Sequence, residues 1–301
     1  MNAFGATLTV SSAKMQRIWA LARLVRPLNI VMIVAGVALG GLLSGGLGAW
    51  QGEEGERLLL AVLSAACIGA AANSFNDVFD LDIDRVNRPG RPLPAGLVSA
   101  AAARLIAVVA SVTGVALGGA VSILHGGLAL GTVGLLYMYN VRLKSTVLVG
   151  NVTVAFVIGL ALVYGGWAVG APGPALVGAG FAFLTTLARE IIKDVEDVEG
   201  DAAAGARTLP VAYGVSMAMQ CTVAVLLVTL LLTPLPFFLL GYRGLFLILM
   251  LGVDALLLWT LWLFWSPQPE RHARRISQML KAVMLAGMIA LAFGAVVQIG
   301  E

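Results

Sequence analysis

The chain has 301 residues, of which 59% are hydrophobic and only 12% are charged, and its mean hydropathy is +0.94. Because soluble globular chains carry about 25% charged residues, this composition excludes an ordinary water-soluble domain. The net charge of +3 is explained by basic loops between apolar stretches, and no nucleic-acid partner is expected. The two cysteines and two histidines form no ligand cluster, which excludes a disulfide framework and a structural zinc site.

Apolar stretches recur along the whole chain, and a transmembrane helix needs about 20 mainly apolar residues. They cover residues 28–46, 57–75, 101–122, 124–140, 146–167, 174–192, 208–232, 241–265 and 278–299. Only His125, Gly126 and Gly127 mark the connection between the third and fourth stretches, and merging these two would reverse every later span. The sequence therefore predicts an all-α integral membrane bundle of nine transmembrane helices, with a single domain over residues 1–301.

Basic residues fall almost entirely on one side of these spans. All lysines and arginines except Arg57 and Arg243 lie in loops of the same side, and cytoplasmic loops are the ones that collect positive charge. The segment 1–27 carries four of them and precedes an apolar run that is too long for a signal-peptide core. We expect a multi-pass protein of the cell membrane whose N-terminus is cytoplasmic and is not cleaved.

Small and aromatic residues at particular spacings predict how the helices pack. Gly36 and Gly40 are four residues apart, which lets two helices approach closely in lipid. Trp259, Trp262 and Trp265 end the eighth span and are typical of an aromatic belt at the membrane interface.

Two acidic motifs with the same D-x-x-D-x-x-x-D spacing lie in the two halves of the chain. Their aspartates are Asp77, Asp80 and Asp84 in the first motif and Asp194, Asp197 and Asp201 in the second. On a helix, positions i, i+3 and i+7 share a face, so each triad is predicted to converge, with Asn73 or Glu190 one turn earlier. Both motifs end an apolar span on the predicted cytoplasmic side. We therefore expect a pseudo-symmetric pair of sites at the mouth of the bundle.

Six carboxylates close together repel one another, so cations are needed to balance their negative charge. Ligation by carboxylates alone favours Mg²⁺, which binds through one or two carboxylates together with substrate phosphate oxygens. Solvated acidic helix ends are the alternative, but acids at the membrane edge in two identical patterns favour a functional site. Nearby basic residues are candidates to hold the phosphates, although positive loop charge explains each one equally well: Arg85, Arg88, Arg91, Arg142, Lys144 and Lys193. Prolines at 89, 92 and 94 predict a stiff loop over the site.

At these motifs the sequence resembles the UbiA superfamily of intramembrane prenyltransferases, whose signature matches residues 76–84 and 194–201 without a gap. The resemblance extends over essentially the whole chain. It implies two halves around a central cavity, in which a prenyl diphosphate binds with Mg²⁺ as the cofactor. The metal ligands it implies are Asn73, Asp77, Asp80, Asp84, Asp194, Asp197 and Asp201, and the same aspartates are the catalytic residues, with Asn76 beside the substrate.

The local sequence in segments 26–29, 87–94 and 189–197 most resembles the branch of this superfamily that makes digeranylgeranylglyceryl phosphate. This implies a geranylgeranyl group as donor and geranylgeranylglyceryl phosphate as acceptor. The acceptor candidates are Arg26, Asn29, Tyr139, Arg142 and Lys144. Leu81 and Pro89 depart from the pattern of hydroxybenzoate prenyltransferases, yet an aromatic acceptor of quinone or chlorophyll synthesis stays open. A membrane transporter or binding protein without catalysis is the alternative from another class.

Overall fold

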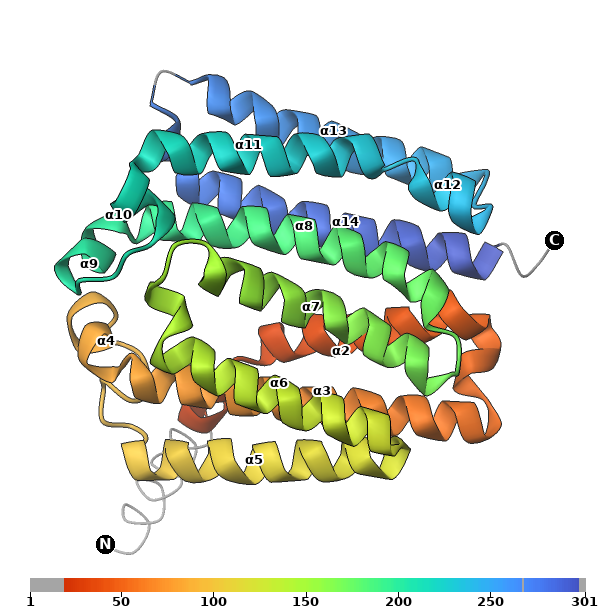
Figure 1. Ribbon diagram of the computed structural model, residues 1–301, viewed down its shortest axis with the longest axis horizontal. Helices are drawn as coiled ribbons and strands as arrows, with labels where there is room; N and C mark the ends of the chain where they lie inside the picture. Colours follow the sequence, from red (N-terminus) through yellow and green to blue (C-terminus); the bar gives the residue numbers. More distant parts are fainter. Residues whose placement is uncertain (1–18, 267, 298–301) are drawn as a thin grey trace, which may run out of the picture. The chain divides into compact units, whose positions relative to one another are not determined.

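The computed structural model describes residues 19–266 and 268–297 (Figure 1), and these residues form helices and connections without a strand. Lys14, Arg17 and most of the predicted cytoplasmic segment 1–27 lie outside the described residues. A short helix covers residues 19–25. The α-helices and the short 3-10 helices (η) that follow are α2 (Pro27–Gly45), η1 (Gly46–Trp50), α3 (Gly52–Phe79), α4 (Leu81–Asn87), α5 (Ala100–Val121), α6 (Ile123–Val141), η2 (Leu143–Ser145), α7 (Val149–Ala168), α8 (Pro172–Glu196), α9 (Val198–Ala203), α10 (Leu209–Tyr213), α11 (Val215–Leu232), α12 (Leu235–Leu240), α13 (Leu245–Trp262), η3 (Leu263–Trp265), η4 (Pro269–His272) and α14 (Ala273–Val297).

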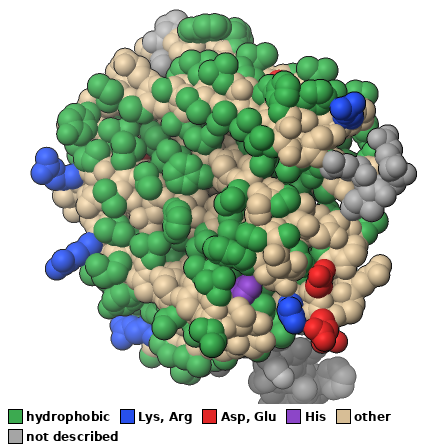
Figure 2. All heavy atoms as spheres, turned by 45° about the vertical axis from the view of Figure 1, so that its right-hand side comes forward, with side chains coloured by type: hydrophobic (Ala, Val, Ile, Leu, Met, Phe, Trp, Pro, Cys, Tyr) green, Lys and Arg blue, Asp and Glu red, His purple; other side chains and the backbone are tan. Residues whose placement is uncertain are grey.

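The all-α membrane fold is confirmed, although the count of nine spans is not. Within the described ranges, 8 helices are long and apolar enough to cross a membrane. Helix α6 is not among them, because His125, Asn140 and several glycines lower its hydropathy, although it has 19 residues. Hydrophobic side chains are spread over the face drawn in Figure 2 with few charged ones among them, as expected for a multi-pass membrane protein.

The connection predicted between the third and fourth spans is a helix break, and it lies at Ser122. The Ser122 hydroxyl accepts a hydrogen bond from the backbone N–H of His125 at 3.2 Å, and it lies 2.8 Å from the His125 ring nitrogen Nδ1. A serine that accepts from the residue three positions later caps a helix N-terminus. The glycines at 126 and 127 therefore do not mark the break, since they lie inside α6.

The chain forms two compact units, and each of them holds one acidic motif. The first unit contains the residues up to Val34 and Leu63–Val141, and the second contains Ala35–Val62 and the residues from Arg142 onward. Helices α2 and α3 each run through both units. The two-halves expectation thus has a counterpart in the fold, whereas the single domain over residues 1–301 stays a prediction.

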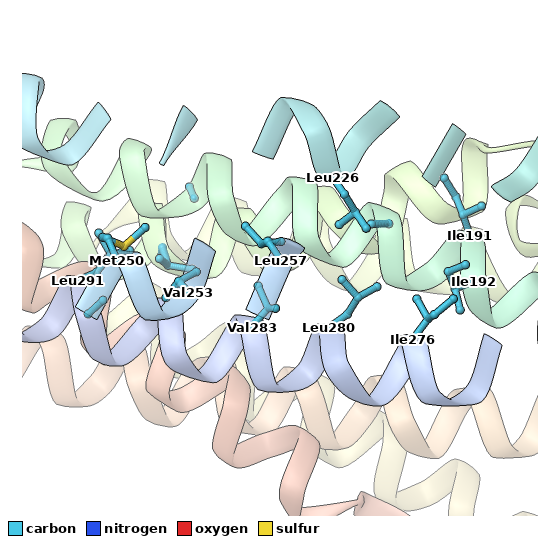
Figure 3. Packing of buried hydrophobic residues seen from close by; sticks show 14 of the residues in the cluster. Ile191, Ile192, Leu226, Met250, Val253, Leu257, Ile276, Leu280, Val283 and Leu291 are labelled. Carbon is cyan, nitrogen blue, oxygen red and sulfur yellow. The ribbon is translucent and has the colours of Figure 1, made fainter. Parts of the chain in front are cut away.

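The second unit is built around a large aliphatic core (Figure 3). Ile191 and Ile192 of α8 pack with Leu226 of α11, Leu257 of α13 and Leu280 of α14, and all five are at most 1% exposed. This core fixes the C-terminal end of α8 that carries the second motif, because buried aliphatic side chains in close packing leave little freedom for the helix to shift.

Glycines bring α2 and α7 into backbone contact inside the second unit. A β-carbon at Gly40 would overlap the Leu162 carbonyl, and one at Gly165 would overlap the Val37 carbonyl. The predicted close approach at Gly40 is therefore confirmed, since no larger residue fits there.

The three tryptophans at the end of α13 and in η3 are exposed, at 46% for Trp259, 61% for Trp262 and 85% for Trp265. The Arg275 guanidinium lies 5.9 Å from the centre of the Trp259 ring, within the range of a cation–π contact. Both observations agree with an aromatic belt at the membrane interface.

Candidate functional site

The first motif lies where α3 passes into α4, and the predicted single helical face is wrong in one respect. Helix α3 ends at Phe79, Asp80 adopts φ −89° and ψ 4°, and Asp84 belongs to α4. The second motif breaks at the equivalent residue, Asp197, with φ −102° and ψ 9°. Asp80 and Asp197 each donate a backbone hydrogen bond four residues back and accept one from four residues ahead, so helical hydrogen bonding is kept at both breaks. The two motifs are therefore interrupted at the same position.

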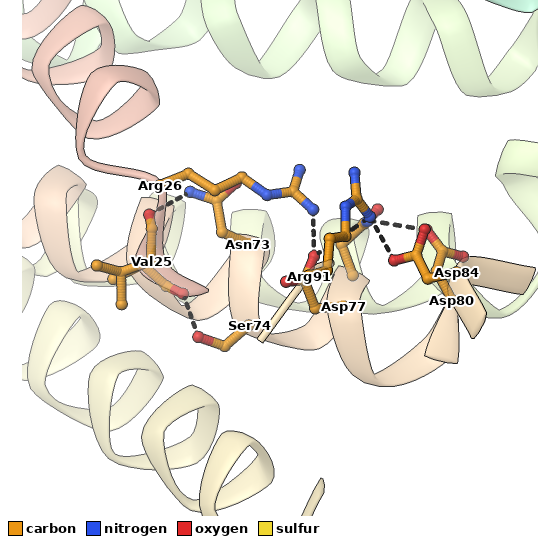
Figure 4. A network of polar contacts seen from close by, with 10 residues as sticks. Val25, Arg26, Asn73, Ser74, Asp77, Asp80, Asp84 and Arg91 are labelled. Carbon is orange, nitrogen blue, oxygen red and sulfur yellow. Dashed lines mark hydrogen bonds and ion pairs between the residues drawn. The ribbon is translucent and has the colours of Figure 1, made fainter. Parts of the chain in front are cut away.

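Two arginines neutralise the buried acids of the first motif. Asp77 is 2% exposed and Asp84 is 4% exposed. Arg26 forms an ion pair with Asp77, and Arg91 forms one with Asp84 and lies 3.7 Å from Asp77. Figure 4 shows both guanidinium groups directed at this row of acids. Buried carboxylates of this kind require such partners.

Arg26 lies in the helix break between the helix of residues 19–25 and α2, and its side chain reaches Asp77 from there. Its φ of 54° is left-handed, a conformation that costs a residue with a β-carbon roughly 1 kcal/mol. The Asn73 side chain donates its Nδ2–H to the carbonyl of Val25 at 2.7 Å, directly before the break. The break is thus held by the same helix face that carries Asp77.

Arg91 reaches the acids from a loop whose following residues are anchored in a core. Leu93 and Val98 are buried with Ala20, Leu24 and Ala103 in a small core of the first unit. Within the loop, the Ala95 N–H donates to the Arg91 carbonyl at 2.9 Å. The proline-rich loop is therefore fixed next to the first motif and delivers one of its predicted basic residues to it.

The second motif has a different set of partners. Asp194 is half-buried and accepts a hydrogen bond from the Nδ2 of Asn151, at the start of α7, at 2.8 Å. Asp197 is exposed at the end of α8, and Asp201 is half-buried in α9 and within electrostatic reach of Asp194. Sequence reasoning missed Asn151, although an amide in an otherwise apolar span was a usable signal.

Glu190 occupies the position in the second motif that Asn73 occupies in the first. Its carboxylate is 6% exposed and pairs with Lys193 Nζ at 2.7 Å and Arg189 Nη1 at 3.0 Å. Lys281 of α14 lies within electrostatic reach of these two cations, and the sequence motifs gave no sign of it. The predicted phosphate ligand Lys193 therefore stands beside the second motif, paired with Glu190.

The other predicted residues differ in their contacts and in their exposure. Asn76 donates to Asp80 at 2.8 Å and so belongs to the first motif. Asn29 is exposed on the first turn of α2, and its backbone N–H donates to the Arg26 carbonyl at 2.9 Å. Arg88 is exposed where α4 ends, Tyr139 is half-buried in α6, and Arg142 is exposed next to the half-buried Lys144 of η2.

The donor set suits a hard cation that arrives with its substrate. No group of three acid, histidine or cysteine side chains gathers to hold a metal within the described residues. Mg²⁺ does not need such a cage, since it binds proteins through one or two carboxylates and takes its other ligands from water and phosphate. The carboxylates of Asp77 and Asp84 meet that requirement beside two guanidinium groups, which are phosphate-binding groups.

Comparison with known proteins identifies the family. The UbiA prenyltransferase family matches residues 27–296. The chain belongs to this family. Among its relatives, a digeranylgeranylglyceryl phosphate synthase of Methanopyrus kandleri is 40% identical over 214 residues, which are 71% of this chain and 77% of the relative. A protein of the same name from Methanothermobacter thermautotrophicus is 34% identical over 90% of this chain and 94% of its own length.

Solved structures of UbiA proteins have the same fold. One from a study of digeranylgeranylglyceryl phosphate synthase in membranes superposes with a TM-score of 0.77 at 27% identity, covering 93% of this chain and 99% of that one. A UbiA homologue from Archaeoglobus fulgidus bound to GPP and Mg²⁺ has a TM-score of 0.64 at 21% identity, over 90% and 99% of the two chains. The prediction of the superfamily from the two motifs is confirmed.

Proposed function

We propose that this UbiA protein transfers a geranylgeranyl group from geranylgeranyl diphosphate, bound with Mg²⁺, to the free hydroxyl of geranylgeranylglyceryl phosphate. The carrying observation is the paired arrangement at the first motif, where buried carboxylates and guanidinium groups meet. Carboxylates bind the cation and guanidinium groups bind phosphate, so the two halves of a metal diphosphate both find ligands there. The names of the relatives support the choice of donor and acceptor.

In this proposal the residues of the first motif exchange partners when the donor arrives. Asp77 and Asp84 release Arg26 and Arg91 and turn to the cation, and the arginines turn to the diphosphate oxygens. Asp80 is proposed to add to this first cation site, and the aspartates of the second motif are proposed as the ligands of a second one. Mg²⁺, when bound, supplies Lewis-acid stabilisation of the negative charge that grows on the leaving group. The guanidinium groups add to this stabilisation through their positive charge and their hydrogen-bond donors.

The transfer exchanges one C–O bond for another and moves one proton. The bond between C1 of the prenyl chain and the diphosphate oxygen breaks, and its electron pair leaves with the diphosphate. The acceptor hydroxyl oxygen then bonds to C1, and its proton passes to the released diphosphate, which is a base. Apolar helix surfaces protect the allylic cation from water, and Tyr139, Arg142 and Lys144 are the residues proposed to orient the acceptor phosphate.

We propose the predicted orientation as well, with the N-terminus and both motifs on the cytoplasmic side. The positive-inside bias supports it, provided that α6 crosses the membrane despite its lower hydropathy. With α6 as a span, the chain crosses the membrane four times between the end of α3 and the end of α8, through α5, α6, α7 and α8. The two motifs therefore reach the same side of the membrane.

The test is a transfer assay with the full chain in lipid nanodiscs and radiolabelled geranylgeranyl diphosphate. Geranylgeranylglyceryl phosphate and hydroxybenzoate are offered separately, with Mg²⁺ or with EDTA. We expect label in a diether lipid that is lost with EDTA and in Asp77→Asn. The matched control is Asp82→Asn, because Asp82 lies in the same segment but its side chain is 90% exposed. Transfer only to hydroxybenzoate would replace the acceptor, and no transfer to either would refute the proposal.

A further inference from the structure

Asn73, one helical turn before Asp77, forms its hydrogen bond with the helix break before Arg26 rather than with the motif residues. Its amide Nδ2–H donates at 2.7 Å to the carbonyl of Val25, and Arg26 follows at φ 54°. One turn later on α3, Asp77 pairs with the Arg26 guanidinium. A single turn of α3 thus holds both the backbone before Arg26 and the side chain of Arg26 (Figure 4).

This contact needs an amide. A carboxylate at position 73 has no hydrogen to donate when ionised, and it would place a negative charge against the Val25 carbonyl oxygen. In the second motif the equivalent residue is Glu190, which binds the cations Arg189 and Lys193 instead of a backbone carbonyl. The two motifs share their aspartate spacing but use their first residue for different contacts, which accounts for asparagine in one and glutamate in the other.

We infer that Asn73 is a positioning residue for Arg26, and that it acts on the donor diphosphate through the direction in which it holds the Arg26 guanidinium. The inference rests on the proposed function, in which Arg26 binds the diphosphate. A residue with a β-carbon keeps a left-handed backbone conformation only where its surroundings hold it. The Asn73 amide donates a side-chain hydrogen bond that holds this junction. The bond to the Val25 carbonyl uses Nδ2 of Asn73 and not Oδ1, so positioning is a role in addition to the implied ligation.

A double-mutant cycle between positions 73 and 26 tests the inference. Asn73→Asp keeps the oxygen ligand and removes the N–H donor, and Arg26→Asn removes the guanidinium while asparagine tolerates left-handed φ. Binding of geranylgeranyl thiodiphosphate, a non-reacting donor, is measured with Mg²⁺ for the wild type, both single variants and the double variant. The Mg²⁺ concentration for half-maximal binding is measured in parallel.

If Asn73 acts through Arg26, its substitution has no effect once Arg26 is gone. We expect Asn73→Asp to weaken donor binding about 10-fold without a rise in the Mg²⁺ midpoint, and the double variant to bind within about 2-fold of Arg26→Asn. Asn73→Ser, which restores a donor, is expected to recover part of the loss and provides a second variant if Asn73→Asp does not fold. Ser74→Ala is the control, because the Ser74 hydroxyl bonds only within its helix, to the Ala70 carbonyl at 2.9 Å.

Multiplicative losses in the double variant would overturn the inference, because they would mean that Asn73 and Arg26 act independently. A loss in Asn73→Asp that appears only as a raised Mg²⁺ midpoint would also overturn it and leave ligation as the sole role. These outcomes differ from a failure of the proposed function, in which the wild type itself would bind no donor.

Discussion

Removing Arg91 leaves the buried carboxylate of Asp84 without its ion-pair partner, and the cost of this change follows from burial. The Asp84 side chain is 6% exposed and the Arg91 side chain is 22% exposed. Breaking a fully buried pair from one side costs about 3–5 kcal/mol, whereas exposed pairs contribute about 0–1 kcal/mol. For this partly exposed arginine we expect Arg91→Gln to lower the free energy of unfolding by about 2 kcal/mol.

Neutralising both partners separates the charge effect from the loss of packing. In Asp84→Asn/Arg91→Gln no charge is left unpaired at this position, and Asp77 keeps Arg26. The double variant should therefore regain about 1 kcal/mol relative to Arg91→Gln. It should not regain activity, since a metal-binding carboxylate and a phosphate-binding cation are both missing.

The measurement is unfolding of the purified protein in mixed micelles by titration with SDS, followed by circular dichroism. The matched control is Arg85→Gln, because the Arg85–Asp82 pair is 61% and 90% exposed and its loss should cost less than about 0.5 kcal/mol. If the double variant were less stable than Arg91→Gln, the argument from unpaired buried charge would be refuted.

Three further predictions concern packing, capping and the second motif. Gly40→Ala should destabilise the protein by about 3 kcal/mol in the same titration, because its β-carbon meets the Leu162 carbonyl, whereas Gly180→Ala, in open space on α8, should be neutral or stabilising; equal effects would contradict the close approach. Ser122→Ala should cost about 1 kcal/mol through loss of the α6 cap, and an unchanged stability would mean that the cap contributes nothing. Asn151→Leu should reduce prenyl transfer at least about 10-fold without a comparable loss of stability, because Asp194 loses its amide hydrogen-bond donor; full activity would exclude Asn151 from the site.

Features that depend on residues near one another in the chain were predictable from the sequence. The length and apolarity of a span are local properties, and so the helices were found although their ends were misplaced by several residues. Helix α14 begins at Ala273 where residue 278 was expected, and the break at Gly214 divides the predicted span 208–232. Glycine with a φ of 87° at that position is a signal that hydropathy alone does not detect.

The acidic triads were identified from spacing alone, but their geometry was only partly correct. Spacing assumes an unbroken helix, and both motifs are interrupted at their middle aspartate. The spacing of the aspartates does not show where a helix is interrupted, so the break at the middle aspartate was not predicted. Spacing therefore identified the acids of the family signature and an idealised face.

The sequence by itself determined that the chain lies in a membrane, which helices it forms and which acids carry the family signature, because hydropathy and helical periodicity act over one or two turns. Only the tertiary structure decided which charges meet. Arg26 and Asp77 are 51 residues apart and Asn151 and Asp194 are 43 apart, and every arginine near the motifs carries the same charge. The path of the chain selects among them, since a buried carboxylate is stable only next to the cation or donor that the fold brings to it.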